Sequence, residues 1–183
     1  LAAIEAGARV TLISGPTNIN APDRASVVAV QSADEMLKAV MSSISDADIF
    51  IGVAAVADYK PVSVENQKIK KSGGSTLTLD LVQNQDILKT VASLENSPFT
   101  VGFAAETENV IEYARTKLTA KNLDMIIANN VADTSIGFNS DQNETTIITR
   151  NLSGTTEAQQ PKMSKENLSR KLIELIAEQI AEA

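Results

Sequence analysis

The stretch IFIGVAAVADYKPVSVENQKIKK, residues Ile49–Lys71, decides the expected fold. It opens with a run of small and apolar residues, Ile49–Ala57, that ends on the single carboxylate Asp58, and it closes with several lysines. A short apolar run without alternation is typical of a strand that is buried on both faces in a parallel sheet. Open α/β sheets bind their ligands at the carboxyl ends of such strands. We therefore expect a buried strand over Ile49–Ala57 and a polar site just beyond it.

The residues before this stretch predict alternating strands and a helix. Arg9–Ser14 and Val27–Val30 are apolar, β-branched runs, which favour strands. Ser32 and Glu35 have the spacing of a capping box, and apolar residues follow them at helical intervals. Strand, helix and strand in this order predict a βαβ unit of a doubly wound sheet.

The second half of the chain continues this pattern. Buried strands are predicted at Phe99–Ala105 and Met125–Ala128, with an amphipathic helix over Asn109–Lys121 between them. Thr145–Thr149 and the turn residues after it predict a hairpin that adds an antiparallel edge, and a C-terminal helix is expected from Ser164. The expected fold is a Rossmann-like, doubly wound α/β domain with a mostly parallel sheet and an antiparallel edge.

Two shorter patterns lie between the lysines and the second half. Leu77, Leu79 and Leu81 alternate with polar residues, which indicates a strand with one face in water. Gln85–Leu94 carries apolar residues at the spacing of a short helix.

Composition limits the classes of function. The 183 residues suffice for one domain with a sizeable core, and a net charge of -7 disfavours binding to nucleic acid or to anionic membranes. There is no cysteine and no histidine, so catalysis would rely on Lys, Asp, Glu, Asn and backbone groups. No apolar stretch of about 18 residues and no signal peptide are found, so a cytoplasmic protein is expected.

Three predicted strands end at the polar residues Asp58, Glu106 and Asn129. In a parallel sheet these ends share one edge, where a carboxylate can bind a divalent cation and amides can contact a base or a sugar. For Glu106 and Asn129 taken alone, a cap that serves only the fold is the favoured interpretation.

Lysines supply the positive charge that a triphosphate needs. Lys68, Lys70 and Lys71 follow Asp58, and one of them would stabilise the negative charge at an attacked phosphate. Lys117 and Lys121 are four residues apart and share one helix face, which is also compatible with an ordinary solvated surface. Neither GxxxxGK(S/T) nor GxGxxG occurs, so neither a P-loop nor a dinucleotide fingerprint supports nucleotide binding.

Several segments together resemble the phosphopantothenate-cysteine ligase domain, which bacteria usually carry fused behind a flavin-dependent phosphopantothenoylcysteine decarboxylase. The resemblance covers roughly Gly7 to the C-terminus, and the combination is much more specific than any one segment. The segments are AAVADY (54–59), KIKK (68–71), VGFAAET (101–107), KNLDMIIANNV (121–131) and GFNSDQN (137–143).

The resemblance implies a ligase that joins 4'-phosphopantothenate to cysteine in coenzyme A biosynthesis. With CTP and Mg2+ or Mn2+, such enzymes convert the carboxylate into an acyl-cytidylate and release pyrophosphate. The amine of cysteine then displaces CMP. A homodimer with the active site near the partner is also implied.

The resemblance assigns roles to particular residues. Asp58 would lie beside the triphosphate and its metal ion, and Lys68 would stabilise charge at the reacting phosphate, so these two are the expected catalytic residues and Asp58 the expected metal ligand. Gly52–Ala54 and Gln85–Leu88 would contact the nucleotide largely through their backbone. The residues expected to line the nucleotide site are Gly52, Val53, Ala54, Ala55, Gln85, Asp86, Ile87, Leu88, Phe103, Lys117 and Lys121.

The chain departs from the family pattern in two places. The family usually has proline where Gln85 stands, which matters little for a backbone contact. The family's first strand and its phosphate-cradling loop, with Asn and Gly, are expected before Leu1. We therefore expect residues 1–183 to form a single ligase domain that lacks these parts and has little activity alone.

Two other functions remain compatible with the residues. One is a Rossmann-type nucleotide-binding enzyme, which would need a glycine-rich loop. The other is a non-catalytic regulatory subunit that has the same fold and binds a protein partner. CTP and ATP are both compatible with the residue pattern itself.

Overall fold

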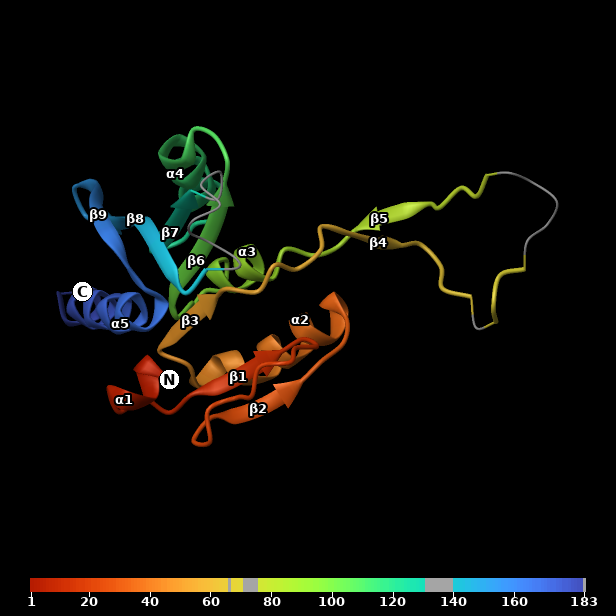
Figure 1. The fold of residues 1–183 in the computed structure, drawn as a ribbon, viewed down its shortest axis with the longest axis horizontal. Helices are drawn as coiled ribbons and strands as arrows, with labels where there is room; N and C mark the ends of the chain where they lie inside the picture. The colour runs from red at the N-terminus through yellow and green to blue at the C-terminus, as the bar shows by residue number, and fades with distance from the viewer. Residues whose placement is uncertain (66, 71–75, 131–139, 183) are drawn as a thin grey trace.

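A mixed sheet forms the centre of the computed structural model, which describes residues 1–65, 67–70, 76–130 and 140–182 (Figure 1). The strand order is β3-β6-β7-β8-β9, with β3, β6 and β7 parallel and β8 and β9 antiparallel. The expected mostly parallel sheet with an antiparallel edge is therefore confirmed. The strands are β3 (Ile49–Gly52), β6 (Phe99–Glu106), β7 (Met125–Asn130), β8 (Gln142–Asn151) and β9 (Gly154–Ser164).

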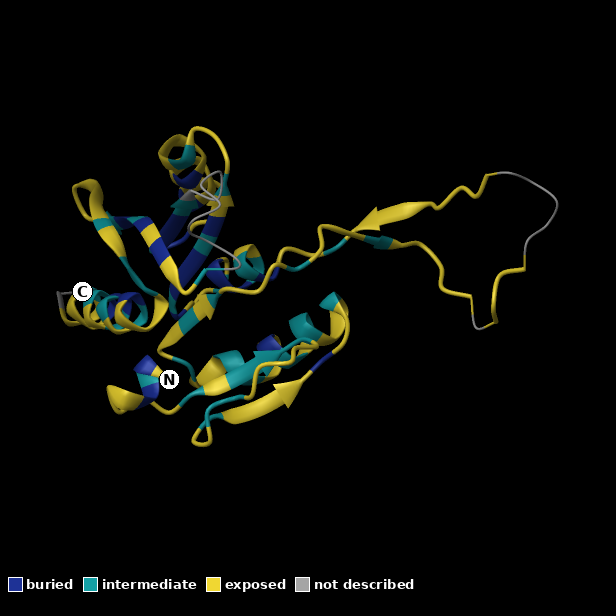
Figure 2. Ribbon diagram, viewed as in Figure 1, coloured by how far each residue is buried: buried dark blue, intermediate teal, exposed yellow. Residues whose placement is uncertain are grey.

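Helices cover both faces of this sheet. Ile126 of β7 packs with Leu118 of α4, whereas the next residue, Ile127, packs with Leu172 of α5 on the opposite face. Both isoleucines are at most 1% exposed, and burial on both faces explains why residues 125–128 of β7 are all apolar. Figure 2 shows that β7 is largely buried. Within the described ranges, none of the helices is long and apolar enough to cross a membrane. The helices are α1 (Ala2–Glu5), α2 (Ala33–Ser43), the 3-10 helix η1 (Ile44–Asp46), α3 (Ile87–Ala92), α4 (Val110–Ala120) and α5 (Lys165–Glu182).

Strands β1 (Thr11–Ser14) and β2 (Ser26–Ala29) form a separate parallel pair. Helix α2 connects β2 to β3, as the expected βαβ unit requires. Ile13 of β1 and Phe50 of β3 pack against the same cluster around Val40 of α2 and Val91 of α3. The two sheets thus lie on a common helical layer, although the expectation of one continuous sheet is wrong for the described residues.

The predicted capping box at the start of α2 is present with one difference. The backbone N–H of Glu35 donates to the Ser32 hydroxyl at 3.2 Å. The Glu35 carboxylate accepts from the backbone N–H of Gln31 at 2.8 Å, rather than from that of Ser32. These bonds satisfy N–H groups that the helix itself leaves unpaired.

The strand expected over Ile49–Ala57 is shorter and more exposed than predicted. Strand β3 ends at Gly52, and among the described residues it pairs only with β6. Ile49 and Ile51 consequently remain 36% exposed each. The prediction of burial on both faces was wrong because an apolar run does not show which strand lies at the edge of the sheet.

Strands β4 (Tyr59–Pro61) and β5 (Leu81–Gln83) form a short antiparallel ribbon that leads away from the sheet (Figure 1). We call residues 59–83 the arm. The strand expected to include Leu77 and Leu79 begins only at Leu81, because pairing with β4 stops there. Lys71 and the first three residues of the GFNSDQN segment, Gly137, Phe138 and Asn139, lie outside the described residues.

Candidate functional site

The carboxyl ends of β3, β6 and β7 meet at one edge of the sheet because these strands are parallel. Gly52 is in register with Gly102, and Glu106 at the end of β6 pairs with Asn130 at the end of β7. The loop after β3 leads from this edge to Asp58. The structure therefore brings the ends of β3, β6 and β7 to one edge of the sheet, as parallel pairing requires, but Asp58 lies six residues beyond the end of β3 rather than at it.

Leu88 of α3 lies over two glycines of the sheet. A Cβ atom on Gly102 would be 2.8 Å from Leu88 Cδ2 and 2.8 Å from Leu123 Cδ1, and a Cβ atom on Gly52 would be 3.2 Å from Leu88 Cδ1. Because glycine has no side chain, α3 can approach the strands closely at these two positions. This contact places the start of α3, with Asp86 as its cap, beside the backbone of β3.

Asn84 ties the loop after β3 to the start of α3. Its Nδ2 donates to the carbonyl oxygen of Ala57 at 2.9 Å, and its backbone N–H donates to the carbonyl oxygen of Asp58 at 2.8 Å. The Oδ1 atom of Asn84 is buried and has no hydrogen-bond partner among the described residues. Sequence reasoning missed Asn84, because its partners are about 26 residues away and nothing in the local pattern marks it.

The Asp58 carboxylate is exposed and forms no hydrogen bond or ion pair within the described part of the chain. In those same ranges, no three acidic side chains converge into a metal-binding group. Mg2+ commonly takes one or two protein carboxylates and completes its shell with water and substrate phosphates. A single exposed carboxylate on the loop after β3 therefore suits a cation that arrives together with a polyphosphate.

Asp86 makes two contacts with its side chain. Its Oδ1 accepts from the backbone N–H of Lys89 at 3.0 Å, which caps α3, and its Oδ2 lies 2.8 Å from Lys121 Nζ. Burial raises the pKa of Asp86, but the bonds from Lys121 and from the Lys89 N–H outweigh burial, so the pKa lies below the usual value. The sequence prediction gave Asp86 only a backbone contact, although its position before the helix matches a common N-cap.

Lys117 is paired in the same way, because its Nζ lies 2.5 Å from Oε1 of the partly buried Glu106. Both α4 lysines predicted for the site therefore point to carboxylates at the edge of the sheet. An ammonium group that contacts one carboxylate has most of its charge compensated but keeps further N–H donors. Lys117 and Lys121 are thus better suited to neutral oxygens, such as a base carbonyl or a hydroxyl, than to phosphate.

Two predicted residues lie apart from this group. Phe103 packs in the core on the α5 face of the sheet, opposite to α4, so its side chain does not join the lysines. Lys68 belongs to the arm between β4 and β5, which extends away from the sheet (Figure 1). Val53, Ala54 and Ala55 are exposed after β3, so their backbone is open to contact.

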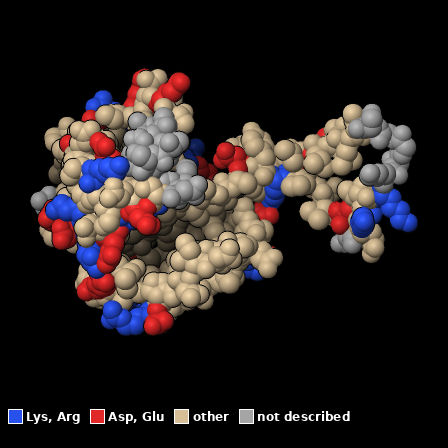
Figure 3. Space-filling model, viewed as in Figure 1, with Lys and Arg blue, Asp and Glu red and all other residues tan. Residues whose placement is uncertain are grey.

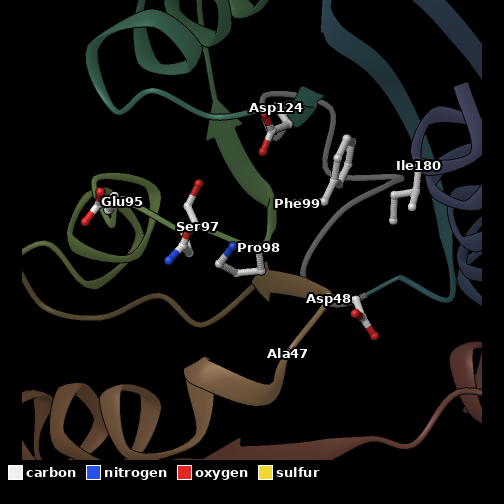
Figure 4. A pocket seen from close by; sticks show the side chains of 9 residues that line it. Ala47, Asp48, Glu95, Ser97, Pro98, Phe99, Asp124 and Ile180 are labelled. Carbon is white, nitrogen blue, oxygen red and sulfur yellow. The ribbon is translucent and has the colours of Figure 1, made fainter. Parts of the chain in front are cut away.

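A cleft of about 660 Å³ lies at the opposite end of the sheet, near the start of β3 and β6 (Figure 4). Its lining includes the carboxylates of Asp48, Glu95 and Asp124. Asp124 accepts from the backbone N–H and the hydroxyl of Thr100 at 2.7 and 2.8 Å, which is a structural role. Acidic walls repel a polyphosphate, and α/β sheets bind ligands at the other end of their strands, so the carboxyl edge is the better candidate.

The strand order and the polar carboxyl edge define a Rossmann-like α/β domain. The family model of the DNA/pantothenate metabolism flavoprotein C-terminal domain matches residues 1–180, and this chain belongs to that family. The membership confirms the resemblance found in the sequence.

Named relatives agree with this membership. The coenzyme A biosynthesis bifunctional protein CoaBC of Vibrio cholerae is 49% identical over 183 residues, which cover 98% of this chain and 44% of that protein. The Bacillus subtilis protein of the same name is 43% identical over 177 residues, which cover 96% of this chain and 43% of that protein. This chain thus spans less than half the length of these relatives.

A solved structure extends the comparison to three dimensions. The crystal structure of the C-terminal domain of coenzyme A biosynthesis bifunctional protein CoaBC matches with a TM-score of 0.80 and 34% sequence identity. The match covers 99% of this chain and 79% of that chain.

Substitutions at Asp86 should separate its cap from its ion pair. Asp86→Asn keeps a capping oxygen but removes the charge, and because the pair is about one-third exposed we expect a loss of only about 0.3–1 kcal/mol in the free energy of unfolding at pH 7. Asp86→Ala also removes the cap, and we expect a loss of about 1–2 kcal/mol. Urea unfolding monitored by circular dichroism measures both values.

The pH dependence gives a further check on Asp86. Since its pKa is lowered on folding, its ionised form contributes stability above about pH 4, the usual pKa of unfolded Asp, and the contribution is lost as the pH falls through the folded-state pKa. The difference in stability between wild type and Asp86→Asn should therefore shrink below about pH 4. A difference that stays constant down to pH 3 would contradict the ion pair with Lys121.

Proposed function

We propose that this chain is the ligase domain that joins 4'-phosphopantothenate to cysteine in coenzyme A biosynthesis, using CTP. The observation that carries the proposal is the arrangement of the carboxyl edge. Asn84 bonds the loop that carries Asp58 to the chain just before α3, Lys121 pairs with Asp86 at the cap of α3, and Lys117 pairs with Glu106 at the end of β6. Membership in the family supports the same activity.

The proposed reaction has two steps. A carboxylate oxygen of 4'-phosphopantothenate attacks the α-phosphorus of CTP, the bond to pyrophosphate breaks, and an acyl-cytidylate forms. The amine nitrogen of cysteine then attacks the acyl carbon, CMP leaves, and the amine gives up a proton as the amide forms. A Mg2+ or Mn2+ ion beside Asp58 would reduce the negative charge of the triphosphate.

We assign different roles to Lys117, Lys121 and Lys68 according to the ion pairs that each one forms. Lys117 and Lys121, whose charges are compensated by Glu106 and Asp86, hold neutral oxygens of the base or the ribose. Lys68 forms no ion pair within the described ranges, so its full charge is available for the reacting phosphate. Because Lys68 lies on the arm, the distal part of the arm must bend over a carboxyl edge, either its own or that of a second copy.

We also propose that residues 1–183 form one domain that needs a further strand and a phosphate loop. Strands β1 and β3 each have one hydrogen-bonded neighbour among the described residues, and α2 and α3 pack beneath both. One more parallel strand between β1 and β3 would join the two sheets and cover Ile49 and Ile51. The position of that strand would be the topological switch point of a doubly wound sheet, where such folds bind ligands.

The biological setting belongs to the same proposal. The relatives are named bifunctional, which supports fusion to a decarboxylase domain upstream of the ligase. We also include a homodimer in the proposal. A cytoplasmic location is proposed because the substrates of the reaction are small, charged and water-soluble.

Isothermal titration calorimetry with CTP, ATP and NAD, each with Mg2+, tests the nucleotide. We expect CTP to bind more tightly than ATP and NAD to show no heat of binding. Preference for NAD would favour a Rossmann-type dinucleotide enzyme instead. Absence of binding by all three, in a chain that carries the additional strand, would favour the regulatory subunit.

An activity assay tests the reaction and the extent of the domain together. A chain that includes the additional strand and loop should release pyrophosphate when CTP and 4'-phosphopantothenate are both present. It should release CMP and form the amide only when cysteine is added as well. The 183 residues alone should be at least about 100-fold slower, because the donors that stabilise the transition state are incomplete. An equal rate from the shorter chain would overturn the proposed need for more residues.

A further inference from the structure

Asp58 and Asn84 flank the arm, one on each side of its base. The backbone N–H of Asn84 donates to the Asp58 carbonyl oxygen at 2.8 Å, which extends the β4–β5 pairing by one position beyond Tyr59 and Gln83. The side chain of Asn84 adds a second bond, because its Nδ2 donates to the carbonyl oxygen of Ala57 at 2.9 Å. Asn84 therefore closes the base of the arm with its backbone and its side chain together.

The carboxylate of Asp58 has no side-chain contact of its own within the described ranges. Its direction is consequently set by the backbone of residues 53–58, the loop after β3. In this loop Val56 packs against the cluster around Val40, whereas Ala57 and Asp58 are exposed. In the described part of the chain, the hydrogen bonds that the backbone of Ala57 and Asp58 forms come from Asn84. These bonds therefore fix the end of the loop that carries the carboxylate.

Asn84 also joins this loop to the charged groups at the start of α3. It lies two residues before Asp86, which caps α3 and whose Oδ2 is 2.8 Å from Lys121 Nζ. Figure 3 shows acidic and basic side chains close together where the arm leaves the domain. One asparagine thus links the carboxylate expected to bind the metal ion, Asp58, with the lysine expected to contact the nucleotide.

Stability alone does not account for an asparagine at this position. Its Oδ1 atom is buried and has no hydrogen-bond partner among the described residues. A buried acceptor without a donor costs as much free energy as one ordinary hydrogen bond contributes, or more. Ala57 is exposed, so water can replace the bond that its carbonyl oxygen would lose. An apolar side chain of the same shape as Asn84 should therefore leave the folded domain about equally stable.

We propose that Asn84 is a positioning residue, which holds the Asp58 carboxylate in the place that the reaction requires. The inference rests on the proposed function in one respect, which is the role of Asp58 in the reaction. A displacement of a reacting group by about 1 Å can lower a rate about 100-fold. Two hydrogen bonds at the end of the loop thus have a large effect on activity and a small effect on stability. Asn84 acts through Asp58 and is not itself a catalytic residue.

Amide hydrogen exchange measured by NMR tests the positioning without any reaction. The Asp58 carbonyl oxygen protects the N–H of residue 84 in wild type. Corrected for intrinsic rates, this N–H should exchange at least about tenfold faster in Asn84→Leu, which keeps the branched shape, and in Asn84→Asp, which has no side-chain N–H.

The matched control for the exchange experiment is Asp34→Asn. It removes the ion pair of Asp34 with Lys60, which is another contact at the base of the arm, and should leave the exchange rate of residue 84 unchanged. Asn84→Leu should unfold at nearly the same urea concentration as wild type, and Asn84→Asp serves if the leucine variant does not fold. Equal exchange rates in wild type and in the Asn84 variants would overturn the proposal, as would faster exchange in Asp34→Asn.

A double-mutant cycle in the complete enzyme tests whether Asn84 acts through Asp58. Asn84→Leu should lower kcat for pyrophosphate release about 10–100-fold, and Asp58→Asn about 100-fold or more. The double variant should be as slow as Asp58→Asn alone, within about threefold, because both substitutions remove the same contribution. Effects that multiply would show that Asn84 acts independently of Asp58 and would overturn the proposal. A complete wild-type enzyme that releases no pyrophosphate would contradict the ligase function, whereas the exchange rates still decide the positioning.

Discussion

Lys68→Gln is expected to lower kcat for CTP-dependent pyrophosphate release by about 10²–10³-fold in the complete enzyme. Glutamine keeps the length and some hydrogen bonding of the side chain but removes the positive charge, which is the property that stabilises the reacting phosphate. Lys68 is exposed and forms no ion pair within the described residues, so the substitution should leave folding intact. Steady-state kinetics with CTP and 4'-phosphopantothenate measure the effect.

Lys70→Gln is the matched control for Lys68. It removes the same charge from the same exposed segment two residues away. We expect it to change kcat by less than about threefold, since an exposed charge two residues further along the arm contributes mainly a screened, long-range field. If Lys68→Gln turns over normally, or if Lys70→Gln is equally slow, the role assigned to Lys68 is wrong.

Gly102→Ala is expected to lower the free energy of unfolding by about 1–3 kcal/mol, which is the usual effect of overfilling a packed core. The added Cβ would lie 2.8 Å from both Leu88 Cδ2 and Leu123 Cδ1, closer than real Cβ contacts allow. Leu88 must then move, and with it the start of α3 that carries Asp86. Chemical denaturation gives the stability change, and CTP titration should show weaker binding.

Two other glycines calibrate this prediction. At Gly15, no atom of the described residues lies within 4 Å of an added Cβ, so Gly15→Ala should change stability by less than about 0.5 kcal/mol. At Gly52, the nearest atom is Leu88 Cδ1 at 3.2 Å, so Gly52→Ala should have an intermediate effect. A Gly102→Ala protein as stable as Gly15→Ala would show that α3 does not pack on the sheet as described.

Short-range patterns predicted most of the elements. The capping spacing of Ser32 and Glu35 located α2, and the continuous apolar run at Met125–Ala128 located β7, the most buried strand of the parallel part. The turn after Thr149 predicted the β8–β9 hairpin. Each of these signals depends on residues within one or two turns of each other, where backbone preference and side-chain periodicity act directly.

The sequence likewise predicted some features of the candidate site and missed others. Motif resemblance located Asp58, Lys117 and Lys121, and parallel pairing explains why their elements meet at one edge. The motif resemblance did not predict that Lys121 pairs with Asp86, that Lys117 pairs with Glu106, or that Asn84 donates a hydrogen bond to the carbonyl oxygen of Ala57. These contacts join residues that are 11 to 35 positions apart. The local sequence pattern around each residue does not indicate which distant residue it contacts.

By itself, the sequence determined that this protein is a Rossmann-like α/β domain of the DNA/pantothenate metabolism flavoprotein C-terminal family, with polar residues at or after the carboxyl ends of its parallel strands. Only the tertiary structure decided that β3 has one hydrogen-bonded neighbour among the described residues, that Phe103 turns to the α5 face, and that Leu77, Leu79 and Leu81 of the arm are exposed. The physical reason is that periodicity along the sequence indicates which side chains are buried. Which element buries them depends on packing between segments that are far apart in the chain.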